Sequence, residues 1–160
     1  MVWIYGASGH GKVIADILEL NNIPVAGFID DNESIHHFMD YRVIRQQELT
    51  DAKPAVILGI GDNAIRKKLA VSLPASYPVV IHPSAVISNH TTIDDGSVIM
   101  AHSVIQPGCV IGKHVIVNTS ASIEHDCQLG NFVHVSPGAV LCGNVTVGEG
   151  TWIGAGTTII

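Results

Sequence analysis

The chain has 160 residues, a length that suits one ordinary domain or two compact halves. Hydrophobic residues make up 47% and charged residues 14%, a balance typical of an ordered, well-buried protein rather than a disordered one. The formal charge of −6 gives no basic surface for nucleic acid or an anionic membrane, so we expect neither partner. No apolar stretch reaches the roughly 20 residues of a membrane span, and the N-terminus lacks a secretory signal, so we expect a cytoplasmic protein.

The first half begins with the pattern of a strand, a glycine turn and a helix. Residues 2–5 are apolar and predict a short strand, and the turn GASGHG occupies residues 6–11. In the helix that follows, the apolar residues are expected on one face. They are Val13, Ile14, Ile17 and Leu18.

The remainder of the first half continues this alternation. Residues 25–29 and 55–60 predict two more strands and residues 78–81 a fourth, while Asp62 is expected to cap a helix that starts just after it. Alternating strands and helices predict a small Rossmann-like parallel α/β domain. The segment 32–51 is polar and ambiguous.

The glycine turn is a candidate nucleotide site, because its N–H groups and the helix N-terminus can approach a phosphate. Asp30 and Asp31 end the predicted second strand, where an acid can bind ribose hydroxyls. The spacing is G-x-x-G-x-G rather than G-x-G-x-x-G, so the dinucleotide fingerprint is not met. A tight strand-to-helix connection without a ligand is the alternative interpretation.

From Ile81 onward an aliphatic residue recurs at every sixth position. Fourteen positions follow this rule: Ile81, Ile87, Ile93, Ile99, Ile105, Ile111, Val117, Ile123, Leu129, Val135, Leu141, Val147, Ile153 and Ile159. Four residues after each of the first thirteen stands a small or β-branched residue, such as Ser97 or Ala121. So long a run of a short period predicts a solenoid, whose repeats pack their apolar residues against one another. We expect two domains, residues 1–80 and 81–160.

The repeat form, aliphatic-x-x-x-small-x with glycine often second, resembles the hexapeptide repeat of left-handed β-helices. The order of GASGHGKVIADIL, GFIDDN, LGIGDN and HPSAVIS before the repeats is similar, along the whole chain, to the PglD/NeuD family of bacterial sugar acetyltransferases. The resemblance implies an N-terminal domain that binds a nucleotide-linked amino sugar for glycan biosynthesis. It also implies acetyl-CoA as co-substrate, no metal, and a homotrimer with the coenzyme in the groove between neighbouring helices.

In such a helix three hexapeptides form one triangular coil, so residues eighteen apart stack at a strand spacing of about 4.8 Å. Cys109 and Cys127 are eighteen apart and are expected as a stacked inward pair. With Cys142 they make an odd number without CxxC spacing, which indicates neither a disulfide framework nor a zinc site.

The resemblance also implies substrate-binding positions. These are Ser8, His10, Asp30, Asp31, Asn32 and Asn118. The stretch NTSASIEHDC, which begins at Asn118, matches the catalytic stretch of the family. Acetyl transfer to an amine requires a base, and a neutral imidazole suits that role. His125 is the candidate base, and Asp126, or less favourably Glu124, would hold its ring in one tautomer.

Four further residues are expected to bind acetyl-CoA: His134, Gly143, Gly154 and Ala155. His134 lies half a coil from His125, so we expect it to approach His125 of a neighbouring subunit. Gly143 stacks one coil beyond His125, and its N–H would bind the thioester oxygen. The sequence stops two residues into a new hexapeptide without a cap, so we expect a shortened chain with further coenzyme contacts beyond Ile160.

Other functions stay open. The histidines are alternatively exposed residues of a solenoid face, as we expect for His90, His102 and His114. A zinc enzyme resembling γ-type carbonic anhydrases is a second class, although the histidine spacing does not match and those proteins lack the glycine-turn domain. A third is a trimeric scaffold that binds sugar nucleotides without turnover. Within the enzyme class, the acceptor is an amine or, as in sialic acid O-acetylation, a hydroxyl.

Overall fold

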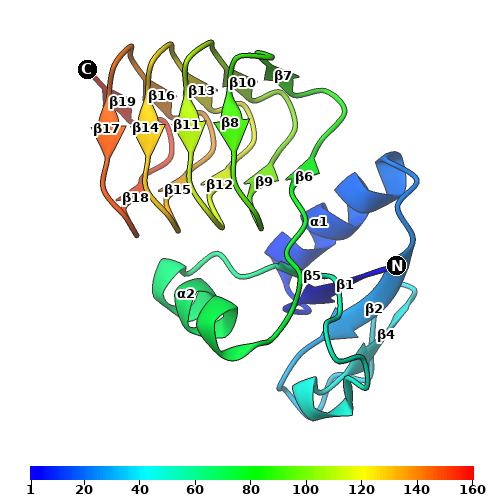
Figure 1. Ribbon diagram of the computed structural model, residues 1–160. Helices are drawn as coiled ribbons and strands as arrows, with labels where there is room; N and C mark the ends of the chain where they lie inside the picture. Colours follow the sequence, from blue (N-terminus) through cyan, green and yellow to red (C-terminus); the bar gives the residue numbers. More distant parts are fainter. The chain divides into compact units, whose positions relative to one another are not determined.

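The computed structural model describes residues 1–160, and the chain divides into two compact units, Met1–Pro78 and Val79–Ile160 (Figure 1). The division lies next to the position where the hexapeptide pattern starts. Neither helix of the chain combines the length and the apolar character that a membrane crossing requires.

The first unit contains a five-stranded sheet in the order β3-β4-β2-β1-β5. Its four parallel strands are β1 (Val2–Tyr5), β2 (Val25–Ile29), β4 (Tyr41–Ile44) and β5 (Val56–Leu58). The short edge strand β3 (His37–Phe38) pairs antiparallel with β4. Three helical segments connect or follow these strands: α1 (Gly9–Leu20), the 3-10 turn η1 (Gln46–Glu48) and α2 (Asn63–Ser72).

Helix α1 packs through a face that contains a glycine. A Cβ atom on Gly11 would lie 2.1 Å from the Gly6 carbonyl oxygen, so only glycine allows the helix to approach the turn so closely. Ile14, Ile17 and Leu18 are fully buried, as predicted. Val13 was wrongly placed on this face: it is 41% exposed, because it lies about 100° around the helix from Ile14.

The predicted strands over 25–29 and 55–60 and the two helices are present, and the Asp62 carboxylate caps α2 by accepting from the Ile65 N–H at 2.8 Å. The predicted fourth strand of this sheet was wrong. Val80 and Ile81 form β6 (Val80–Ile81), which pairs with a strand of the solenoid instead. Two strands that the sequence analysis did not predict, β3 and β4, lie in the polar segment 32–51, whose structure was ambiguous from its sequence.

The second unit is the predicted left-handed β-helix. Each of its fourteen strands has two residues and ends on a residue of the sixfold aliphatic series. The strands are β6, β7 (Val86–Ile87), β8 (Thr92–Ile93), β9 (Val98–Ile99), β10 (Val104–Ile105), β11 (Val110–Ile111), β12 (Ile116–Val117), β13 (Ser122–Ile123), β14 (Gln128–Leu129), β15 (His134–Val135), β16 (Val140–Leu141), β17 (Thr146–Val147), β18 (Trp152–Ile153) and β19 (Thr158–Ile159).

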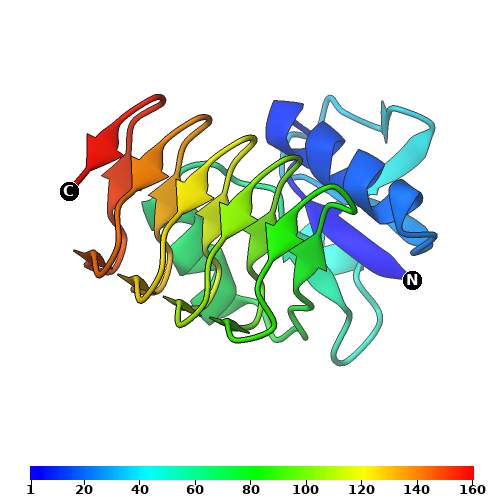
Figure 2. The ribbon, with the colours of Figure 1, turned by 90° about the horizontal axis from the view of Figure 1, so that it is seen from above.

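These strands form three parallel sheets, one for each face of the coil: β7-β10-β13-β16-β19, β8-β11-β14-β17 and β6-β9-β12-β15-β18. Every pairing joins residues eighteen apart, as in Val104 with Ser122. Figure 2 shows the strands of successive coils side by side. Side chains eighteen residues apart are therefore direct neighbours, which confirms the predicted coil.

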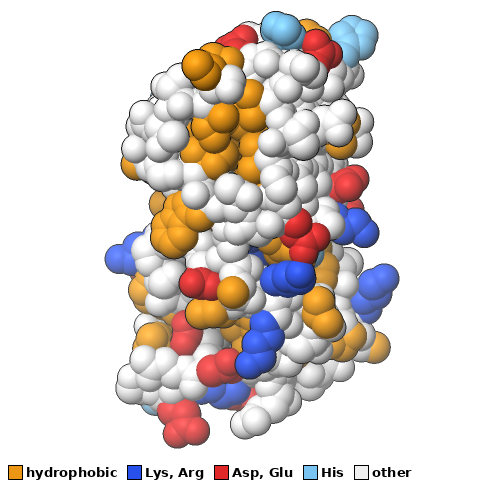
Figure 3. Space-filling model, turned by 90° about the vertical axis from the view of Figure 1, so that its left-hand side faces the viewer, with side chains coloured by type: hydrophobic (Ala, Val, Ile, Leu, Met, Phe, Trp, Pro, Cys, Tyr) orange, Lys and Arg blue, Asp and Glu red, His pale blue; other side chains and the backbone are white.

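The aliphatic and small residues of the repeat fill the interior of the coil. Ile105, Ile123 and Leu141 lie in one column of this core and are at most 1% exposed. Cys109 and Cys127 are in the same core as free thiols, which confirms the predicted inward pair. Seen from the C-terminal end of the β-helix, hydrophobic side chains occupy the middle of that end, with backbone and other side chains around them (Figure 3).

From Gly96 onward, the corners between faces contain one residue with a left-handed backbone in every hexapeptide. The series with positive φ runs without a gap: Gly96, His102, Gly108, His114, Ser120, Asp126, Phe132, Gly138, Asn144, Gly150 and Gly156. Glycine adopts this region freely and most other residues adopt it only rarely, so the turn at each of these corners restricts the backbone. His125 immediately precedes one of these corner residues, Asp126.

Candidate active site

His125 and Asp126 lie together at the corner between β13 and β14. Asp126 adopts φ 62°, and its Oδ2 is 2.9 Å from Nδ1 of His125. The two side chains are 64% and 65% exposed. A carboxylate at Nδ1 stabilises the tautomer that carries its proton there, which leaves the Nε2 lone pair available. The Nε2 atom forms no hydrogen bond within the chain.

Glu124, the other acid proposed for this role, points elsewhere. Its Oε1 accepts a hydrogen bond from the Ser122 hydroxyl at 3.2 Å. Of the two neighbouring carboxylates, only that of Asp126 contacts the imidazole.

The ring of His125 lies against Gly143 in the next coil. A Cβ atom on Gly143 would come within 2.6 Å of Cε1 and 2.7 Å of Nε2 of that ring. The two coils are joined beside it by a hydrogen bond from the Asn144 N–H to the His125 carbonyl, at 2.8 Å. Gly143 is therefore required by contact with the imidazole, since any side chain would displace the ring.

The N–H of Gly143 forms no hydrogen bond within residues 1–160 and is free to bind a ligand. The same position of other hexapeptides is occupied by Pro83, Pro107 and Pro137. Proline has no N–H, so the β-helix does not need an amide donor at this position. This amide and the Nε2 atom of His125 are next to each other on the surface of the coil.

His134 belongs to a different face, in strand β15. Its Nε2 is 3.1 Å from Nδ2 of Asn118, and its ring stacks on Trp152 with a centroid distance of 5.5 Å and an angle of 6°. The indole N–H of Trp152 in turn donates to the Ser136 hydroxyl at 2.8 Å. Asn118 and His134 are thus brought together, but no contact joins either of them to His125.

Gly154 and Ala155 are exposed in the corner between β18 and β19. A Cβ atom on Gly154 would meet only the Thr157 hydroxyl, at 3.4 Å. No hydrogen bond joins either residue to the other predicted site residues.

In the first unit, Asp30 ties the glycine turn to the end of β2. Its Oδ2 accepts from the Ala7 N–H at 2.8 Å, and its Oδ1 accepts from the Asn32 N–H at 2.9 Å. Ser8, at the N-cap position of α1, is exposed, with its hydroxyl 3.5 Å from the Gly59 carbonyl oxygen, and His10 follows in the first helical turn. The predicted polar residues therefore gather at the carboxyl ends of the parallel strands, where such sheets bind ligands.

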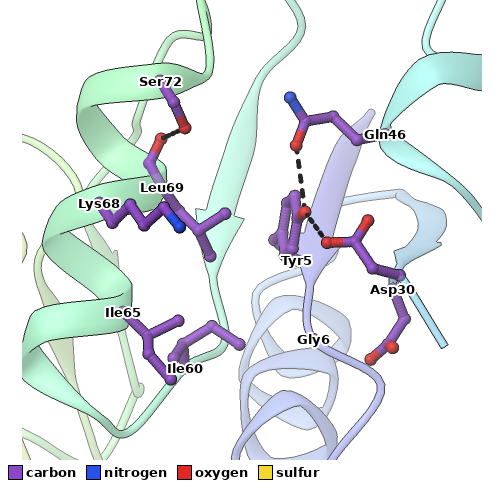
Figure 4. Close-up of a pocket in the computed structure, with 10 residues that line it drawn as sticks. Tyr5, Gly6, Asp30, Gln46, Ile60, Ile65, Lys68, Leu69 and Ser72 are labelled. Atoms are coloured by element: carbon purple, nitrogen blue, oxygen red, sulfur yellow. Dashed lines mark hydrogen bonds between the residues drawn. The ribbon is translucent and has the colours of Figure 1, made fainter.

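A cavity of about 530 Å³ opens beside this group, between the ends of β1 and β2 and the helix α2. Asp30 and Asp31 line it, together with residues that the sequence did not single out. Figure 4 shows Tyr5 and Gln46 on one side of it and Lys68 and Leu69 of α2 on the other. Its volume is within the usual range of small-molecule sites.

Tyr5 provides the polar centre of this cavity. Its hydroxyl donates to Oδ2 of Asp31 at 2.8 Å and lies 3.1 Å from Oε1 of Gln46. Burial first, and then the hydrogen bond to Asp31, raise the pKa of Tyr5, so the phenol stays protonated and acts as a donor. The sequence alone indicates Tyr5 only as part of an apolar strand, because its hydrogen-bond partner Asp31 is far along the chain.

Arg66 shapes the wall formed by the loop between β5 and α2. The side chain is 1% exposed, and its guanidinium donates to the carbonyls of Ile60 (3.0 Å) and Gly61 (3.1 Å) and to Oδ1 of Asn63 (2.8 Å). Burial lowers its pKa to about 10, so it remains charged near neutral pH. Ile60 itself lines the cavity.

No group of three or more His, Cys, Asp and Glu side chains in residues 1–160 is placed to hold a metal ion.

Comparison with known proteins places this geometry in a family. A sequence profile of the PglD N-terminal domain matches residues 1–73. The acetyltransferase domain of PglB from Neisseria gonorrhoeae FA1090, solved in complex with acetyl coenzyme A, is 34% identical with a TM-score of 0.85, over 99% of this chain and 90% of that one. The chain belongs to the PglD/NeuD family of bacterial sugar acetyltransferases.

Two further relatives are similar to nearly the whole chain. PerB from Caulobacter crescentus, solved in complex with CoA and GDP-perosamine, is 28% identical with a TM-score of 0.81, over 99% of this chain and 88% of that one. The GDP-perosamine N-acetyltransferase of Escherichia coli O157:H7 is 28% identical over 168 residues, which cover 98% of this chain and 76% of the relative. As a PglD/NeuD family member the chain is an acyltransferase, which confirms the predicted enzyme class.

Proposed function

We propose that the chain transfers the acetyl group of acetyl-CoA to the amine of a nucleotide-linked amino sugar, with His125 as the general base. The observation that carries this proposal is the His125 imidazole held by Asp126 at Nδ1 and exposed at Nε2, beside the unbonded N–H of Gly143. Relatives solved with acetyl coenzyme A, and with CoA and GDP-perosamine, support both substrates.

In the proposed reaction the amine nitrogen attacks the carbonyl carbon of the thioester while Nε2 of His125 accepts the amine proton. The carbonyl oxygen becomes an oxyanion, and the Gly143 N–H donates a hydrogen bond to it. When the intermediate collapses, the carbon–sulfur bond breaks and the protonated His125 returns the proton to the leaving CoA thiolate. Asp126 stabilises the imidazolium throughout.

The two units would divide the substrates between them. Residues 1–80 would hold the sugar nucleotide, with Tyr5, Asp31 and Lys68 lining its cavity. The carbonyl-rich loop held by Arg66 and the glycine turn would supply the remaining walls. Residues 81–160 would hold acetyl-CoA, with His134, Gly143, Gly154 and Ala155 along its path.

The active form in this proposal is a homotrimer with three shared sites. His125 lies at the corner after β13, and His134 lies in β15, on another sheet of the same coil. The interior of the coil is filled by the hydrophobic core and has no room for a coenzyme. A threefold axis parallel to the helices would place His134 of one subunit opposite His125 of the next.

A thiol-release assay tests the proposed function. Acetyl-CoA would be offered with GDP-, UDP- and CMP-linked amino sugars, GDP-perosamine among them, and with the matching hydroxy sugars. Release of CoA only with an amino sugar supports N-acetylation, and release with the hydroxy sugars would favour O-acetylation. No release with any of them, together with tight sugar-nucleotide binding, would favour the scaffold function.

A further inference from the structure

Inward side chains of the β-helix near the His125 corner form a ladder of hydrogen bonds that the proposed mechanism has not used. Thr91, Cys109 and Cys127 stand eighteen residues apart in one inward column of the β-helix. Each donates to a carbonyl fifteen residues further along: Thr91 to Gln106 at 3.0 Å, Cys109 to Glu124 at 3.0 Å and Cys127 to Cys142 at 3.1 Å.

The two thiols reach the peptide units of the candidate active site. The Glu124 carbonyl belongs to the peptide bond that leads into His125, and the Cys142 carbonyl belongs to the one that leads into Gly143. A trans peptide is planar, and its C=O and N–H point in opposite directions. A thiol that holds the Cys142 carbonyl toward the core therefore directs the Gly143 N–H outward, to the side where the His125 ring lies.

We propose that Cys127 is a positioning residue for the oxyanion donor: its thiol fixes the Cys142–Gly143 peptide plane, and Cys109 does the same for the peptide before His125. The inference rests on the proposed function, since it assigns the Gly143 N–H a role in binding the thioester oxygen.

At other corners of the β-helix a different donor binds the equivalent carbonyl. At Asn118 and Ser136 the equivalent carbonyl accepts from the backbone N–H three residues later, that of Ala121 or Ala139. No such turn bond closes at Glu124 or Cys142, where the thiol is the donor instead. An alanine at the small position of the repeat is thus compatible with the fold, but the carbonyl then accepts its hydrogen bond from a backbone N–H and not from a side chain.

The thiols are suited to act as donors. Cys109 and Cys127 are at most 1% exposed. Burial raises the pKa of both, so each keeps its proton at neutral pH. A thiol is a weak donor, so the effect of each thiol on the peptide plane, and hence on the rate, is expected to be modest.

Three substitutions of Cys127 separate the hydrogen bond from packing. Cys127→Ser keeps a donor, Cys127→Ala removes it, and Cys127→Val removes it while filling the space, as Val145 does in the next coil of the same column. We expect kcat of the Ala and Val variants to fall about 3- to 10-fold, less than complete loss of an oxyanion donor would cost. KM for both substrates should change less than twofold, and Cys127→Ser should restore kcat to within about twofold.

The matched control is Thr91→Val, which removes the hydrogen bond from the Thr91 hydroxyl to the Gln106 carbonyl, one coil further from the candidate site. It should leave kcat unchanged while lowering the melting temperature about as much as Cys127→Ala. The inference is overturned if folded Cys127→Ala and Cys127→Val both keep the wild-type kcat. It is also overturned if Cys127→Ser loses as much kcat as Cys127→Ala, or if Thr91→Val does. If His125→Ala also keeps its turnover, the proposed function itself fails; if His125→Ala is inactive and the Cys127 variants are not, only the positioning role fails.

Discussion

At the scale of single residues, the contact between Gly143 and the His125 ring can be altered without changing the core. Gly143→Ala would insert a Cβ atom where the imidazole now lies, at 2.6 Å from Cε1. Because the ring is the exposed end of a side chain, it can move aside, so stability should change little. We expect kcat to fall about 10- to 100-fold, since a displacement of about 1 Å at a reacting group has effects of that size.

The control for this variant is Gly148→Ala, because a Cβ atom there would meet only the Thr151 hydroxyl, at 3.9 Å. Steady-state kinetics and thermal melting would be measured for both proteins. A Gly143→Ala enzyme with wild-type kcat would show that His125 does not act from the position described.

Asp126→Asn tests the carboxylate that holds the base. Asparagine tolerates the positive φ of this corner and keeps the size of the side chain, so the fold should be preserved. The imidazolium loses its negative partner, and we expect kcat to fall about 10- to 100-fold, less than for a buried triad because this pair is largely exposed. Glu124→Gln is the control and should be nearly neutral. A larger loss for Glu124→Gln would reverse the roles of the two acids.

At the scale of elements, the hydrogen bonds between the turn after β1 and the end of β2 lead us to expect different effects when Asp30 and Asp31 are replaced. Asp30 accepts two backbone hydrogen bonds, so Asp30→Ala should weaken sugar-nucleotide binding and also lower the melting temperature. The Asp31 carboxylate accepts one hydrogen bond, from the Tyr5 hydroxyl, so Asp31→Ala should weaken binding with little loss of stability. Affinity for acetyl-CoA should be unchanged in both.

Calorimetry of each variant with each ligand, beside thermal melting, checks this pair. Equal loss of acetyl-CoA affinity would contradict the division of substrates between the two units. Tight binding of NAD without binding of sugar nucleotides would replace the proposed substrate class with a dinucleotide.

The elements also show how far the sequence alone can lead. The β-helix could be predicted nearly residue by residue, because its sixfold period is set by local geometry and repeats without a gap. The strand β4 could not, because Tyr41 and Arg42 are polar members of an edge region whose pairing depends on β2. The apolar segment around Val80 is compatible in sequence with the sheet of the first unit and with the β-helix. In the structure Val80 pairs with Val98 of the β-helix.

The same distinction holds for the candidate sites. His125, Asp126 and Gly143 could be located from a motif and an eighteen-residue spacing. Tyr5 and Lys68 could not, since Tyr5 resembles a core residue of a strand and Lys68 a solvated helix residue. Only the pairing of β1 with β2 and the position of α2 show that both line one cavity.

At the scale of the whole molecule, the proposed trimer predicts complementation between inactive subunits. Homotrimers of His125→Ala and of His134→Ala should each be strongly impaired. In mixed trimers some interfaces would combine an intact His125 with an intact His134, so mixing should regain part of the lost activity. Sedimentation would establish the oligomer, and labelled subunits would confirm exchange. An active monomer, or confirmed exchange without recovery, would contradict shared sites.

The most direct measurement is the turnover of His125→Ala with acetyl-CoA and an accepted nucleotide-linked amino sugar, in a protein shown by calorimetry to bind both. Loss of a positioned general base predicts a kcat about 100- to 10,000-fold below that of the wild type, with both affinities retained. A loss of less than about tenfold in such a protein would contradict the assignment of His125 as the base.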